Sequence, residues 1–101
     1  MGFVKVAKVS DVSEGTGTMV SVEGTEVALF NVGGTFYAIN NTCMHRGGPL
    51  GEGMLDGNVV TCPWHGWQYD VTSGKGVSPS HAQVPSYKVK VEGEDVLVSL
   101  D

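Results

Sequence analysis

Short runs in which apolar and polar residues alternate, or which are rich in β-branched residues, account for most of this chain. Alternation with a period of two predicts β-strands, because successive side chains of a strand point to opposite faces. Such runs occupy residues 3–9, 18–23, 26–32, 35–40, 58–62, 67–71, 86–92 and 95–100. Residues typical of turns separate them, at 23–25, 33–34, 56–58, 73–76 and 92–95.

Helical periodicity is nearly absent by comparison. No segment keeps a helical period over about ten residues, and only residues 10–15 suggest a single helical turn. Many short strands with frequent turns are typical of small sandwiches and barrels. The pattern therefore predicts an all-β fold of about eight strands.

Two stretches interrupt the alternation, residues 41–55 (NTCMHRGGPLGEGML) and residues 62–67 (CPWHGW). Both lie between predicted strands, so both are predicted to be loops, and a β-scaffold that presents loops is a common way to build a site. Strand signals at 57–61 and 67–71 bracket the second loop as a hairpin would. Because the first loop leads straight into that hairpin, we expect the two loop tips to lie side by side.

The bulk composition fits one folded domain over residues 1–101. Hydrophobic residues make up 41% of the chain and charged residues 17%, which is typical of a globular protein. The net charge of -5 disfavours nucleic acid or an anionic membrane as a partner and favours a partner with a basic docking patch. There is no apolar run long enough to span a membrane and no signal-peptide pattern at the start. We therefore expect a cytoplasmic protein.

The two predicted loops hold both cysteines of the chain, and a histidine closely follows each one. Cys43 and His45 form a C-x-H pair, whereas Cys62 and His65 form a C-x-x-H pair. A disulfide would be unusual in a cytoplasmic chain and would leave the histidines unexplained. Buried structural cysteines with incidental surface histidines would require two matched pairs to arise by chance.

A metal site explains the pairing better. Zinc accepts two thiolates and two imidazoles, but the common zinc modules pair cysteine with cysteine and histidine with histidine. In a two-iron cluster, one iron can take two thiolates and the other two imidazoles, so that each loop supplies one ligand to each iron. The mixed pairs therefore favour a two-iron cluster, and zinc remains the alternative.

The same residues carry a resemblance to a known family. The motifs CMH at 43–45 and CPWHGW at 62–67 resemble those of Rieske proteins, most closely the small soluble Rieske ferredoxins. The flanking segments VGGTFYAINNTC and YDVTSGKG are also similar to family sequence, so the resemblance covers nearly the whole chain. It implies an antiparallel β base with a small cluster-binding subdomain, approximately residues 41–68.

The resemblance also implies a ligand set and a role. One [2Fe–2S] cluster would be bound by Cys43 and Cys62 at the inner iron and by His45 and His65 at the outer iron. The protein would be a monomeric one-electron carrier rather than an enzyme. It would accept electrons from a flavin-dependent reductase and pass them to a terminal oxygenase, such as a ring-hydroxylating dioxygenase, or to a reductase. The alternatives are a small Rieske subunit of an assimilatory nitrite reductase-like enzyme and a zinc-bound interaction module.

Residues near the two pairs resemble the low-potential branch of the family. The high-potential branch carries an extra cysteine in each loop, joined as a disulfide, where this chain has Gly48 and Trp64. Trp67 stands in place of a serine whose hydroxyl would reach the cluster. Tyr69 matches a tyrosine that could hydrogen-bond a cysteine sulfur. The resemblance therefore implies a potential in the low part of the Rieske range of roughly -150 to +300 mV.

Further residues are expected to shape the surroundings of the site. An apolar collar around the histidines is predicted from Met44, Pro49, Leu50, Pro63 and Trp64. Glycines let a loop backbone approach a cluster closely, and the candidates here are Gly47, Gly48 and Gly66. The segment 78–86 resembles a proline-bearing loop that covers the cluster from a third side. His81 lies in it and is predicted to be a surface residue rather than a ligand.

Overall fold

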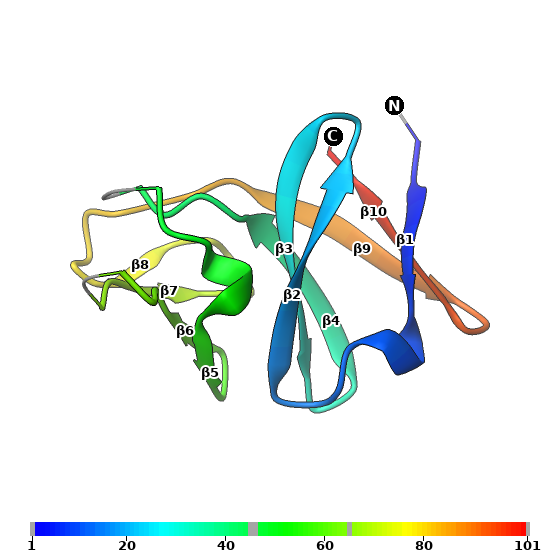
Figure 1. Ribbon diagram of the computed structural model, residues 1–101, viewed down its shortest axis with the longest axis horizontal. Helices are drawn as coiled ribbons and strands as arrows, with labels where there is room; N and C mark the ends of the chain where they lie inside the picture. The colour runs from blue at the N-terminus through cyan, green and yellow to red at the C-terminus, as the bar shows by residue number, and fades with distance from the viewer. Residues whose placement is uncertain (1, 45–46, 65, 101) are drawn as a thin grey trace.

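The computed structural model describes residues 2–44, 47–64 and 66–100, and strands dominate its secondary structure (Figure 1). The first half of the chain forms β1 (Val4–Lys8), β2 (Thr16–Val22), β3 (Thr25–Val32), β4 (Thr35–Asn40) and β5 (Met54–Asp56). The second half forms β6 (Val59–Thr61), β7 (Gln68–Asp70), β8 (Gly76–Ser78), β9 (Ser86–Glu92) and β10 (Asp95–Ser99). Two short 3-10 turns complete the set, η1 (Val9–Asp11) and η2 (Leu50–Glu52).

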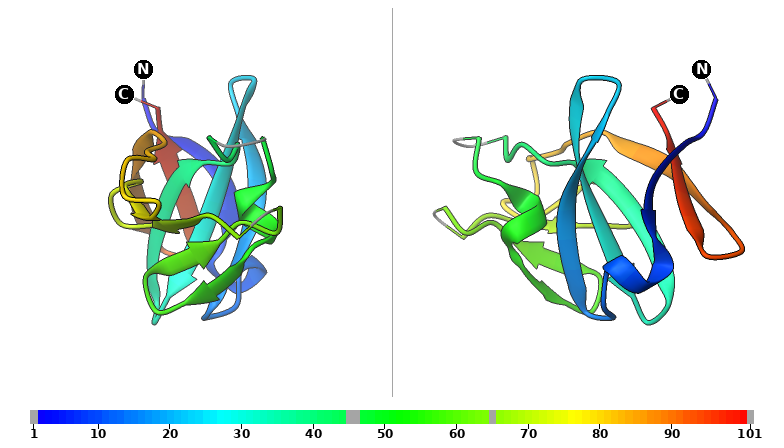
Figure 2. Two further views of the ribbon diagram at one scale, coloured as in Figure 1. Left: turned by 90° about the vertical axis from the view of Figure 1, so that its left-hand side faces the viewer. Right: turned by 45° about the vertical axis from the view of Figure 1, so that its right-hand side comes forward.

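The strands form two antiparallel sheets. The large sheet has the order β1-β10-β9-β4-β3-β2 and is nearly closed, because β1 and β2 at its two ends also contact each other. The small sheet has the order β5-β6-β7-β8 and lies at one end of the molecule, with β1 and β10 at the other (Figure 2). No helix among the residues described is long and apolar enough to cross a membrane.

The all-β prediction is confirmed, with two additions. Each of the eight predicted runs overlaps one strand, and η1 overlaps the start of the predicted helical turn. The structure adds β5 and β8, which are three residues long, too short for an alternating pattern to become visible. The predicted loop 41–55 is therefore wrong at its end, because β5 begins at Met54. The small sheet continues beyond residue 68 to Ser78.

Strand β3 separates two hydrophobic cores. Its central residues are buried on both faces, and successive side chains point in opposite directions. Val27 and Leu29 join a core inside the large sheet, while Ala28 and Phe30 join a second core between the large sheet and the small one. The continuous apolar run in β3 is thus explained by burial on both sides. The second core is the one that contains both cysteines.

Candidate metal centre

The first cysteine lies in a loop that closes on itself directly after β4. The Cys43 N–H donates to the Gly48 carbonyl at 2.9 Å, and the Gly47 N–H donates back to the Cys43 carbonyl at 2.9 Å. Gly47 has a φ of +74°, which glycine adopts without steric cost. The Leu50 N–H then reaches the Asn41 carbonyl at 2.7 Å, at the start of η2. These bonds fix the position of Cys43 relative to the large sheet.

The second cysteine ends a strand of the predicted hairpin. Strands β6 and β7 pair antiparallel, with Thr61 opposite Gln68, so the predicted hairpin is confirmed. The Cys62 N–H donates to the Trp67 carbonyl at 2.7 Å and extends the pairing beyond the strands. The Trp64 N–H turns back to the Cys62 sulfur at 3.4 Å. The loop therefore provides a hydrogen-bond donor for that sulfur.

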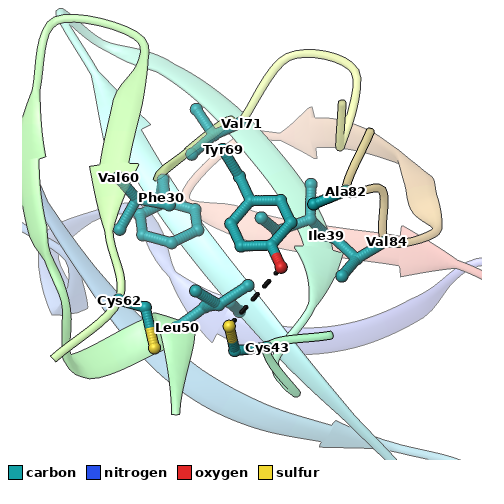
Figure 3. Close-up of a cluster of buried hydrophobic side chains, with 11 residues drawn as sticks. Phe30, Ile39, Cys43, Leu50, Val60, Cys62, Tyr69, Val71, Ala82 and Val84 are labelled. Carbon is teal, nitrogen blue, oxygen red and sulfur yellow. Dashed lines mark hydrogen bonds between the residues drawn. The ribbon is translucent and has the colours of Figure 1, made fainter. Parts of the chain in front are cut away.

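Both thiols are buried in one core and come from separate loops (Figure 3). Each cysteine is 2% exposed, and neither forms a disulfide. The disulfide considered from the sequence is thus absent. Burial raises the pKa of the Cys62 thiol, the Trp64 N–H lowers it, and the nearby Cys43 raises it again. A metal that binds here must displace the thiol protons, because the thiolate is the ligand form.

Tyr69 supplies a hydroxyl to the other sulfur. Its ring is fully buried, and its oxygen lies 3.4 Å from the Cys43 sulfur (Figure 3). The same oxygen accepts the Met44 N–H at 3.0 Å, so the hydroxyl proton is free to point at the sulfur. Burial raises the pKa of Tyr69 to about 12, so the phenol keeps its proton at neutral pH. The predicted contact between Tyr69 and a cysteine sulfur is confirmed.

The segment after β8 packs against both cysteine loops. The Gln83 N–H donates to the Met44 sulfur at 3.5 Å. The rings of Trp67 and His81 meet edge to face, with centroids 5.8 Å apart. Ala82 is buried in the same core as the cysteines. The segment therefore covers the site from a third side, and His81 is exposed as predicted.

Some predicted site residues are placed differently or not described. His45 and His65 lie outside the described residues. Within the described parts of the chain, no three metal-ligating side chains gather at one point. Met44 and Trp64 are exposed, as expected of a collar, but Leu50 is fully buried in η2. The turn directs the Leu50 side chain into the core that holds the cysteines, and a collar around the histidines stays a prediction because both histidines lie outside the described residues.

Two buried thiols that converge in one core, each with a hydrogen-bond partner at its sulfur, form a pair that can bind a metal through sulfur. The chain matches the Rieske [2Fe-2S] domain over residues 2–88 and belongs to this family. It is 40% identical, over 97% of its length and 92% of the relative's, to the biphenyl dioxygenase ferredoxin subunit of a Pseudomonas strain, KKS102.

Solved structures agree with this assignment. The fold matches the ferredoxin of carbazole 1,9a-dioxygenase from Nocardioides aromaticivorans IC177 with a TM-score of 0.92 and 31% identity, over 98% of both chains. It also matches a chain from a complex of reduced oxygenase and oxidized ferredoxin of carbazole 1,9a-dioxygenase. That match has a TM-score of 0.90 and 36% identity, over 98% of this chain and 94% of the other.

The residues described fit the cluster of this family. A Rieske-type [2Fe–2S] cluster needs two thiolates and two imidazoles, and the chain offers two free, converging thiols. Donors already reach both sulfurs, from Tyr69 and from the Trp64 backbone. The cluster supplies a reversible one-electron couple when it is bound.

Proposed function

We propose that this protein is a Rieske ferredoxin, a one-electron carrier whose cluster is bound by Cys43, His45, Cys62 and His65. The convergence of the two buried thiols in one core is the observation that carries the proposal. Each thiol precedes a histidine by two or three positions in the sequence, which supplies the mixed ligand set that this family requires.

The chain's own residues set the ease of reduction. Two ferric ions, two sulfides and two thiolates sum to a charge of zero, and reduction leaves one negative charge at the site. The Tyr69 hydroxyl and the Trp64 N–H both stabilise that charge from hydrogen-bond distance. The apolar core around the sulfurs makes reduction harder, because the burial of a negative charge is costly. The absence of a serine hydroxyl at Trp67 supports a potential in the low part of the Rieske range.

The partners are a flavin-dependent reductase, which supplies electrons, and a terminal oxygenase of the ring-hydroxylating type. Two relatives are ferredoxin components of dioxygenase systems, and one solved structure is a complex of ferredoxin with its oxygenase. The carrier is monomeric and cytoplasmic. Docking near the two proposed histidine ligands is supported by Met44 and Trp64, which directly precede those histidines in the sequence and expose apolar side chains.

The midpoint potential of the purified protein across pH, measured by voltammetry together with an EPR spectrum, tests the proposal. We expect a Rieske EPR signal and a single redox couple with a midpoint potential of about -150 mV. This potential should not change with pH around neutrality. A potential well above zero that falls as pH rises through neutral contradicts the low-potential role. A colourless protein that holds zinc overturns the redox role altogether.

A second measurement separates a free carrier from an enzyme subunit. The protein purified from its native host should elute as a monomer in size-exclusion chromatography. Stable co-purification with a large flavoprotein or haem protein would instead favour the nitrite reductase-like subunit.

A further inference from the structure

Gly48 is the residue at which the two cysteine loops meet. It is buried, and its carbonyl accepts the Cys43 N–H at 2.9 Å, so its backbone belongs to the first loop's framework. The second loop occupies the space where a side chain would stand. A Cβ at position 48 would lie 2.6 Å from the Cys62 sulfur and 3.1 Å from both Cβ and Cγ of Trp64. Any larger residue must therefore displace the Cys62 sulfur or shift the backbone of Gly48.

Neighbouring glycines serve a different purpose. Gly47 and Gly66 have positive φ angles, and a Cβ at either position would meet at most the Thr42 methyl group, at 3.6 Å. These glycines are favoured by backbone conformation. Gly48 has no positive φ, so its requirement is one of volume. In the sequence GG at 47–48, the first glycine is thus required by backbone conformation and the second by the small space available.

Trp64 completes the contact from the second loop. Its backbone N–H donates to the Cys62 sulfur, and the first atoms of its side chain face the Cα of Gly48. Trp64 is 50% exposed, whereas Cys62 beside it is only 2% exposed. The tryptophan therefore lies at the surface next to this buried sulfur, and its first side-chain atoms pack against Gly48.

We propose that Gly48 and Trp64 form a noncovalent lock between the two cysteine loops. The lock sets how closely the loops approach and excludes water from the Cys62 sulfur. Gly48 is a positioning residue, because it acts through Cys62 and Trp64. The proposal rests on the ligand role proposed for Cys62. Water is a hydrogen-bond donor and would stabilise the negative charge of the reduced site, so the lock holds the potential low.

Variants of Trp64 test the lock without altering the first loop. Trp64→Phe keeps Cβ, Cγ and an aromatic cover, whereas Trp64→Ala removes Cγ and the cover. We expect the potential of Trp64→Phe to stay near that of the wild type and the potential of Trp64→Ala to rise. Voltammetry and EPR of the cluster-loaded proteins give the comparison. Equal potentials for the two variants would overturn the water-excluding role.

Gly48→Ala tests the steric part, with Gly57→Asn as a matched control. Gly57 also lies in the small-sheet region, has a φ of +60° and has open space around it, and asparagine tolerates that conformation. We expect Gly48→Ala to alter the EPR signal and the potential and to lower iron content per chain, while the control remains like the wild type. In the double variant Gly48→Ala/Trp64→Ala, loss of the crowded Cγ should restore part of the iron content.

The outcomes separate the lock from the proposed function. A wild-type protein without a Rieske signal would overturn the function. A normal wild type with a Gly48→Ala variant of unchanged potential and EPR signal would overturn the lock alone. If Gly48→Ala does not fold, the double variant and the Trp64 pair still decide the question.

Discussion

The core inside the large sheet and the core beside the small sheet are equally well buried but differ in chemistry. The first contains only hydrocarbon side chains among its buried members: Val12, Val22, Val27, Leu29, Phe36, Ala38, Val96 and Val98. The second also buries two thiols and a phenol hydroxyl, from Cys43, Cys62 and Tyr69. The first core therefore contributes packing alone, whereas the second combines packing with two of the proposed cluster ligands.

The two cores share strands, which ties the site to the fold. Within β3, Leu29 points to the first core and Phe30 to the second, and β4 divides Ala38 and Ile39 in the same way. A shift of either strand by one residue would exchange the two sets. The register of the large sheet thus positions the wall against which the cysteine loops pack.

Removal of a cysteine sulfur should have the largest effect of the changes considered. That effect should be confined to the second core. Cys43→Ala removes a proposed ligand, so we expect loss of the cluster and of visible colour. The far-UV circular dichroism spectrum should still indicate β structure, because the large sheet keeps its own core. A fully coloured Cys43→Ala protein would contradict the ligand assignment.

The sequence predicted the first core more completely than the second. The alternating run 86–92 and the continuous apolar run in 26–32 identified strands of the large sheet, because each pattern extends over several residues. Strands β5 and β8 escaped prediction, since three residues carry too little pattern. The spacing of Cys43 and Cys62 from their histidines predicted a metal site; the family match supports its [2Fe–2S] cluster, and the four ligands stay a prediction.

Other features of the site depend on contacts between distant segments. Leu50 could not be assigned to the core before η2 was known, because an apolar residue in a glycine-rich loop can point either way. The bond from Gln83 to the Met44 sulfur joins residues 39 positions apart. The volume requirement at Gly48 likewise arises from the packing of the second loop. No local pattern encodes these contacts.

The same deletion in each core should give similar stability losses and different redox effects. Leu29 in the first core and Leu50 in the second are both fully buried. Leu29→Ala and Leu50→Ala should each lower the free energy of unfolding by about 2–5 kcal/mol, as measured by urea denaturation. Only Leu50→Ala should also change the EPR spectrum and the potential. A shifted potential in Leu29→Ala would mean that the two cores are not independent.

The smallest expected effect comes from removal of one oxygen. Tyr69→Phe eliminates the hydroxyl at the Cys43 sulfur and leaves the ring in place. A hydrogen bond contributes about 1 kcal/mol, which for one electron corresponds to about 40 mV. Because the hydroxyl stabilises the reduced site, we expect the potential to fall by about that amount while the cluster is retained.

Tyr87→Phe is the matched control from the other core. The Tyr87 ring packs against the first core, and its hydroxyl accepts a hydrogen bond from the Asn40 side chain at 3.1 Å. Removal of the Tyr87 hydroxyl should lower the free energy of unfolding by about 1 kcal/mol. The midpoint potential should not change. Voltammetry of both variants under one set of conditions decides the matter. If the two potentials move together, the effect is a general loosening of the fold, and the Tyr69 hydroxyl has no specific influence on the site.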